Sequence, residues 1–165
     1  MRASSSVSES SPSSARPGAD NGEYDVYRAR YNYGTVTLEE AMERLRVRAT
    51  ADGVELEVVT SNHEGDLVDR MHEIVREQGA SDVKAVIVNP GGATAYSVAV
   101  LDALIAANLP VVEVHISNRY KKPGGEIREK DLISRLAVGQ VVGLGVQGYE
   151  FALEWLLTNV FADGS

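Results

Sequence analysis

The stretches Val86–Tyr96 (VIVNPGGATAY) and Val111–Tyr120 (VVEVHISNRY) decide the expected fold. Each begins with a short apolar run, typical of a buried strand, and ends in a polar turn. In an open parallel α/β sheet, ligands bind just beyond the carboxyl ends of the strands. Asn89, His115 and Ser117 therefore stand where we expect a small-molecule site.

Strands and helices alternate along the rest of the chain. Strands are expected over residues 54–59, 84–89, 110–115 and 141–144, and helices over 38–49, 64–77, 96–107, 147–161 and part of 126–136. Thr37 is expected to cap the first helix with Glu40, because their spacing is that of a capping box. This order predicts an α/β fold with a parallel sheet of four to five strands, covered by helices on both faces.

The N-terminal segment is poor in apolar residues. Residues 1–20 are rich in Ser, so we expect a disordered tail followed by a single domain over residues 21–165. Residues 23–33 leave two alternatives open. Tyr24, Val26 and Arg28 alternate with Asp25, Tyr27 and Ala29, which allows a fifth strand over residues 23–31. The same stretch could instead form an aromatic-rich loop over the site.

Composition narrows the class of protein. A length of 165 residues fits one domain, and the absence of cysteine excludes disulfides and thiolate metal sites. The formal net charge of −8 argues against nucleic acid as a partner. No apolar run is long enough for a bilayer span, so we expect no membrane partner and a cytoplasmic location.

Four strings give a more specific interpretation: SNHEGDLVDRMHE at 61–73, NPGGATAYSVAVLDAL at 89–104, EVHISN at 113–118 and GLGVQGYEFAL at 143–153. Together they closely resemble type II 3-dehydroquinate dehydratase. The resemblance implies a flavodoxin-like three-layer sandwich, usually assembled as a dodecamer of trimers. It also implies the loss of water from 3-dehydroquinate without metal or organic cofactor.

The family's reaction is a trans elimination through an enolate, and the resemblance assigns its catalytic groups. Tyr33 matches the lid tyrosine that removes the proton, and Arg28 matches the arginine that activates it. A tyrosine base needs a nearby cation, because its ordinary pKa is about 10. His115 matches the general acid, and Glu113 would orient its ring.

The resemblance also implies how a carboxylated substrate is bound. The amides of Ile116 and Ser117, with the Ser117 hydroxyl, match the carboxylate site, and Asn89 matches the residue that holds a water against the enolate oxygen. Arg128 matches the arginine that grips substrate hydroxyls. Asp102 matches an aspartate that reaches the site of a neighbouring subunit, which is consistent with a homo-oligomer, a trimer or a dodecamer.

The chain departs from the family pattern around substrate recognition. Ala95 replaces a substrate-binding histidine, Tyr96 stands beside it, and Lys122 stands where the lid-contacting arginine usually is. The family's opening strand is not recognisable. Three functions therefore stay open: the family's dehydratase, a dehydratase or cyclase repurposed for another substrate, and a non-catalytic scaffold. Gly143-Leu144-Gly145 is interpreted as the place where the last helix packs closely, not as a nucleotide-binding turn.

Overall fold

The structure is a computed structural model that describes residues 36–77, 82–121 and 126–162. The expected tail (residues 1–20) and the strand or loop expected over residues 23–33 lie outside these ranges.

Helices and strands alternate, as predicted. The helices are α2 (Leu38–Ala51), α3 (Glu64–Arg76), α4 (Val98–Ala107), the short α5 (Glu126–Glu129) and α6 (Gln147–Asn159). The strands are β1 (Val86–Val88), β2 (Val111–His115) and β3 (Gly139–Val142), and the 3-10 turns are η1 (Ala93–Ala95) and η2 (Arg119–Lys121). The capping box is confirmed, since the Glu40 N–H donates to Thr37 Oγ1 and the Thr37 N–H donates to Glu40 Oε2.

The three strands form one parallel sheet in the order β1-β2-β3. Val86 pairs with Val111, and Val114 pairs with Val141. Every residue of β2 is buried, because the strand has a neighbour on each side and helices over both faces. The carboxyl ends of β1 and β2 therefore lie at one edge of the sheet, where a site was expected.

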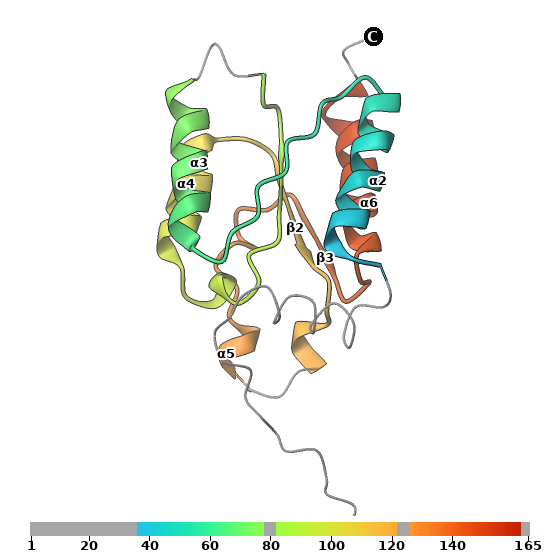
Figure 1. The fold of residues 1–165 in the computed structure, drawn as a ribbon. Helices are drawn as coiled ribbons and strands as arrows, with labels where there is room; N and C mark the ends of the chain where they lie inside the picture. Colours follow the sequence, from blue (N-terminus) through green and yellow to red (C-terminus); the bar gives the residue numbers. More distant parts are fainter. Residues whose placement is uncertain (1–35, 78–81, 122–125, 163–165) are drawn as a thin grey trace, which may run out of the picture.

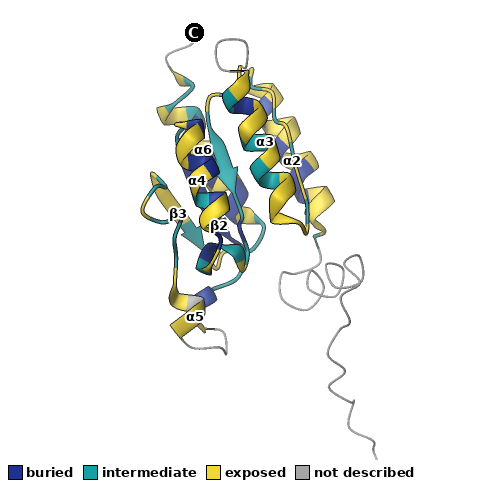
Figure 2. Cartoon of the chain, turned by 90° about the vertical axis from the view of Figure 1, so that its left-hand side faces the viewer, coloured by how far each residue is buried: buried dark blue, intermediate teal, exposed yellow. Residues whose placement is uncertain are grey.

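Helices cover both faces of the sheet and give three layers (Figure 1). α3 and α4 lie on one face, and α2 and α6 lie on the other. The inner sides of these helices are buried and their outer sides are exposed (Figure 2). None of the helices in the described part of the chain is both long and apolar enough to cross a bilayer.

The prediction of a strand over Val54–Val59 is wrong for the described residues. Val54, Leu56 and Val58 are half-buried and alternate with the exposed Glu55 and Glu57, as the pattern implied. The segment nevertheless forms no ladder, and β1, β2 and β3 alone make up the sheet of the described residues. The described sheet therefore has three strands, where four were expected from these residues.

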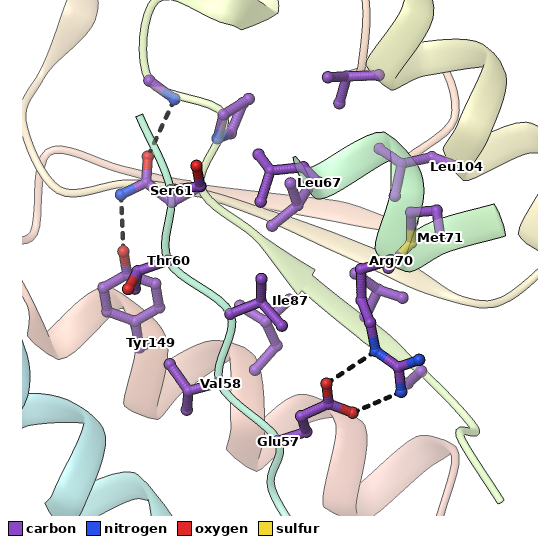
Figure 3. A pocket seen from close by; sticks show the side chains of 18 of the residues that line it. Glu57, Val58, Thr60, Ser61, Leu67, Arg70, Met71, Ile87, Leu104 and Tyr149 are labelled. Carbon is purple, nitrogen blue, oxygen red and sulfur yellow. Dashed lines mark hydrogen bonds and ion pairs between the residues drawn. The ribbon is translucent and has the colours of Figure 1, made fainter. Parts of the chain in front are cut away.

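A long groove separates the segment over residues 54–60 from β1. It is part of a cavity of about 1550 Å³, larger than the roughly 300–1,000 Å³ of an ordinary small-molecule pocket. Val58, Ile87, Leu67 and Met71 are among its apolar lining (Figure 3). The lining runs along β1 and reaches the residues at the carboxyl edge of the sheet, among them Asn89 and His115.

The last strand begins and ends two residues earlier than the predicted Val141–Leu144. Gly143 ends it, because its φ of +88° cannot continue a strand. A Cβ atom at this position would lie 2.9 Å from the Cβ of Asn118. The Gly143 N–H donates to the His115 carbonyl at 2.8 Å, so this turn is held against the end of β2.

Close packing of the last helix depends on another glycine than the sequence suggested. A Cβ atom on Gly148 would lie 3.2 Å from a methyl group of Val114 and 3.3 Å from one of Val141. Gly145 has open space at the same position. Gly148 thus lets α6 approach the sheet, while Gly143 lets the turn after β3 approach the turn after β2.

Candidate active site

The residues that follow β1 and β2 meet at the carboxyl edge of the sheet. Asn89 comes directly after β1, and His115 is the last residue of β2, followed by Ile116 and Ser117. All four line the large cavity. His115 is buried and the other three are half-buried. The structure therefore brings together the four residues that the sequence placed at this edge.

His115 is fixed by a carboxylate of its own strand. Its Nε2 atom lies 2.8 Å from Glu113 Oε1, and the Glu113 side chain is fully buried. Nε2 also lies 3.4 Å from an Arg119 nitrogen, which can only donate. Since the carboxylate is the closer partner and can only accept, we assign the hydrogen to Nε2. Nδ1 has no hydrogen bond to any described residue and is the nitrogen left for chemistry.

Two further side chains hold Glu113. Thr94, from η1, lies with its hydroxyl 3.0 Å from Glu113 Oε1, and the Gln140 amide donates to Glu113 Oε2. The carboxylate is therefore held by residues from three parts of the chain, His115 included. The expectation that Glu113 orients the histidine agrees with this geometry.

An ion pair that sequence reasoning missed lies beside His115. Arg119 donates to Asp131 Oδ2 at 2.7 Å and also to the Lys130 carbonyl, and its guanidinium lies over the Tyr120 ring. Burial, the largest influence on the pKa of Asp131, raises it. Hydrogen bonds from the Ser134 N–H and two side chains, with the Arg119 charge, outweigh burial and leave that pKa below its ordinary value. Asp131 is therefore a carboxylate at neutral pH.

Asn89 is held by the last helix. Its Nδ2 donates to the hydroxyl of Tyr149 at 2.7 Å, and its Oδ1 accepts from the Gly91 N–H at 3.2 Å. Tyr149 was expected only to pack in the core. Its hydroxyl instead positions Asn89, which lines the cavity, and Tyr149 itself lies away from the ion pair of Glu57 and Arg70 (Figure 3).

Glu113, His115 and Asp131 could together be considered for a metal, since one ligand atom from each lies within 4.8 Å of the others. The carboxylate oxygen atoms of Glu113 and Asp131 already accept hydrogen bonds, and the donors are Thr94, Arg119 and Gln140. The guanidinium of Arg119 supplies the positive charge that a metal would otherwise bring. The donor set thus fits a network of ion pairs better than a cation site.

Comparison with known proteins shows the family of the chain. The family model "Dehydroquinase class II" matches residues 23–157. The 3-dehydroquinate dehydratase of Halothermothrix orenii is 42% identical over 133 residues, which are 81% of this chain and 84% of that protein. The chain belongs to the class II dehydroquinase family. Catabolic 3-dehydroquinase 2 of Neosartorya fischeri is 40% identical over 130 residues, 79% of this chain and 82% of that protein.

Solved structures confirm the class II dehydroquinase fold. A type II dehydroquinase from Butyrivibrio crossotus aligns with a TM-score of 0.70 and 30% identity, covering 81% of this chain and 88% of that one. The type II dehydroquinase from Propionibacterium acnes aligns with a TM-score of 0.67 and 32% identity, covering 77% and 83%. The relatives are named for a dehydration, so the family is one of carbon–oxygen lyases.

Of the remaining residues assigned by resemblance, only Asp102 has a described side chain. Asp102 is exposed on α4 and does not line the cavity. Tyr33 and Arg28 lie outside the described residues, and of Arg128 only the backbone is described. Ala95 lines the cavity, so the departure from the class II dehydroquinase pattern at this position faces the site.

Four residues of the polar network were missed by sequence reasoning: Thr94, Arg119, Asp131 and Gln140. They come from four separate places in the chain, and each alone resembles an ordinary surface residue. Arg119 carried the one usable signal, because it follows His115 by four residues in the same strand-end turn.

Proposed function

We propose that this chain catalyses the trans elimination of water from 3-dehydroquinate, giving 3-dehydroshikimate. The observation that carries the proposal is the His115–Glu113 pair, with its 2.8 Å contact, at the cavity edge that also holds Asn89 and Ser117. Family membership supports the substrate, because relatives of about 40% identity are named for it. The reaction belongs to the shikimate pathway of aromatic amino acid biosynthesis or to its catabolic counterpart.

The first step removes a proton from the carbon next to the substrate carbonyl. Tyr33 is assigned as the base and Arg28 as the cation that makes the phenolate accessible. The electron pair of the broken C–H bond moves into the ring and leaves an enolate on the carbonyl oxygen. Asn89 has its amide fixed by Tyr149, and we assign it to hold a water molecule against that oxygen.

The second step expels the hydroxyl group from the carbon next to the one that lost its proton. The enolate electrons reform the carbonyl, the carbon–carbon double bond forms, and the carbon–oxygen bond breaks. His115 gives a proton to the departing oxygen, so the product is water. Its Nδ1 is the nitrogen for this transfer, since Nε2 is held by Glu113.

Substrate binding follows from the groups beside His115. The amides of Ile116 and Ser117, with the Ser117 hydroxyl, are assigned to the substrate carboxylate, and Arg128 to its hydroxyls. Asp102 is assigned to a neighbouring subunit's site in a homo-oligomer, either a trimer or a dodecamer. The mechanism needs no metal or organic cofactor, and we expect a cytoplasmic enzyme.

One observation favours a second function, a dehydratase or cyclase acting on a different carboxylated hydroxy-ketone. Ala95 lines the cavity where the family pattern has a histidine, so this chain lacks a hydrogen-bonding group for a substrate hydroxyl. A site without that partner discriminates poorly for the hydroxyl. Substrates that lack this hydroxyl would then be turned over at rates similar to that of 3-dehydroquinate.

Turnover of 3-dehydroquinate by the purified full chain tests the proposal. Formation of the conjugated enone is followed by absorbance, for the wild type and for His115→Ala. Loss of the general acid should lower kcat by about 10²–10⁴-fold. His72→Ala is the matched control, because His72 is exposed on α3 away from the cavity, and its rate should stay unchanged. A folded wild-type protein without turnover would contradict the proposal.

A further inference from the structure

The buried network around His115 contains two acids and two bases. Side-chain exposure is 0% for Glu113, 7% for His115, 7% for Arg119 and 8% for Asp131. Thr94 Oγ1 lies 3.0 Å from Glu113 and 2.9 Å from Asp131, and the Gln140 amide donates to both carboxylates. The two carboxylates are thus linked into one unit.

Charge balance in this network depends on Asp131. Arg119 lies 3.4 Å from His115 Nε2, so an uncompensated guanidinium there would oppose a second positive charge on the ring. Asp131 takes up the Arg119 charge at 2.7 Å. Among these four side chains, a protonated ring would then give two carboxylates facing two cations.

We propose that Asp131 is a positioning residue of the active site, which neutralises Arg119 and thereby allows His115 to carry the proton that it delivers. Asp131 does not line the large cavity, so we assign it no contact with the substrate. It acts through Arg119 on the ring and, through Thr94 and Gln140, on the Glu113 carboxylate that holds Nε2. The proposal rests on the proposed dehydration and deepens it, because it assigns a residue that acts on the general acid without touching the reacting atoms.

Arg119 also has a purely structural use. It joins the turn after β2 to the Lys130 carbonyl, so its loss, or the loss of Asp131, could simply loosen residues 130–134. A structural role alone would lower thermal stability and the amount of folded enzyme. It would leave the protonation of His115 and the pH profile of the folded enzyme unchanged. The test therefore measures the titration of His115 and the pH profile of the rate.

The test is ¹⁵N NMR of the histidine side chains in the full chain, with Asp131→Asn as the variant. His115 is assigned among the three histidines by the His115→Ala spectrum. In Asp131→Asn the His115 ring should lose its proton about one pH unit lower than in the wild type. This shift corresponds to about tenfold weaker proton affinity. The control is Glu154→Gln, which removes an exposed ion pair with Arg48 far from the cavity and should leave the titration unchanged.

The double variant Arg119→Met with Asp131→Asn separates charge from packing. Removing both charges should return the His115 titration close to that of the wild type, a coupling that two independent losses would not give. Steady-state rates on 3-dehydroquinate should follow: the alkaline limb of kcat moves to lower pH in Asp131→Asn while KM changes little, and it returns in the double variant.

Each result decides the proposal. An unchanged His115 titration in a folded Asp131→Asn protein would overturn it, and so would a shift that persists in the double variant. The NMR readout needs no turnover. An inactive wild type with the expected titration shifts would therefore contradict the proposed dehydration while supporting the role of Asp131 in holding the charge of His115.

Discussion

Tyr149 links the core of the protein to its site at the scale of one residue. Its ring is buried in the cluster between α2, α6 and the sheet, and its hydroxyl accepts from Asn89. A tyrosine has an apolar ring and a polar hydroxyl. Sequence patterning therefore identified the packing of the ring and missed the hydrogen bond of the hydroxyl.

Replacing Tyr149 with Phe should remove the Asn89 contact and keep the packing. We expect a loss of about 1 kcal/mol in the free energy of unfolding, the usual net value of one hydrogen bond. Urea denaturation measures it, with Tyr120→Phe as the control because Tyr120 is exposed. Equal stability of the two variants would show that the hydroxyl of Tyr149 contributes nothing.

Asp131 should also make stability depend on pH. Its pKa is lowered in the folded chain, so its contribution is present above about pH 4, the ordinary range of an aspartate, and is lost as pH falls further. Asp131→Asn should therefore be less stable than the wild type at pH 7, and the difference should shrink below pH 4. Thermal denaturation across this range measures it. A difference that grows in acid would contradict a lowered pKa of Asp131 in the folded chain.

Turns between elements help to position the site, together with the strands. The turn after β3 contacts the turn after β2 at Gly143, with a hydrogen bond to the His115 carbonyl. Sequence reasoning recognised a special glycine there but assigned it to helix packing. Only the contact across two turns, far apart in the chain, reveals its use.

Gly143→Ala should destabilise the protein and disturb the site together. A positive φ costs an alanine roughly 1–2 kcal/mol, and its Cβ atom would meet Asn118. Gly139→Ala in β3 is the matched control, because its Cβ atom would meet nothing within 4 Å. Urea denaturation and kcat should both change for Gly143→Ala only. Similar losses in both variants would indicate a general intolerance of β3, not a specific close approach.

At the scale of the whole molecule, the sequence was sufficient for the fold class, the helices and the sheet edge where Asn89 and His115 meet. Alternation of short apolar runs with helical periodicity carries that information, because it reflects burial directly. The segment 54–59 shows where this reasoning fails. Its alternating burial was predicted correctly, but a strand also needs a partner, and pattern alone does not reveal whether one lies beside it.

The polar network shows a second limit of the same kind. His115 and Glu113 share a strand at a spacing of two, so their contact could be inferred from sequence and resemblance. Asp131 and Gln140 reach the same network from distant positions, and no local pattern marks them.

Truncation tests the proposed domain boundaries. Removing residues 1–20 should leave the free energy of unfolding and the turnover unchanged, because a Ser-rich segment has little apolar surface to bury. Removing residues 1–34 should abolish turnover, since Arg28 and Tyr33 are lost with it. Denaturation and steady-state rates measure both variants. Equal activity of the longer truncation would exclude Tyr33 as the base.

The most direct measurement uses 3-dehydroquinate labelled with deuterium at one hydrogen of the methylene next to its carbonyl. The wild-type chain should convert it to 3-dehydroshikimate with loss of the axial hydrogen and retention of the equatorial one, as mass spectrometry of the product would show. This outcome is what a trans elimination requires, whereas the part of His115 is tested by the His115→Ala rate. Loss of the equatorial hydrogen, or a folded protein that forms no product, would contradict the proposed mechanism.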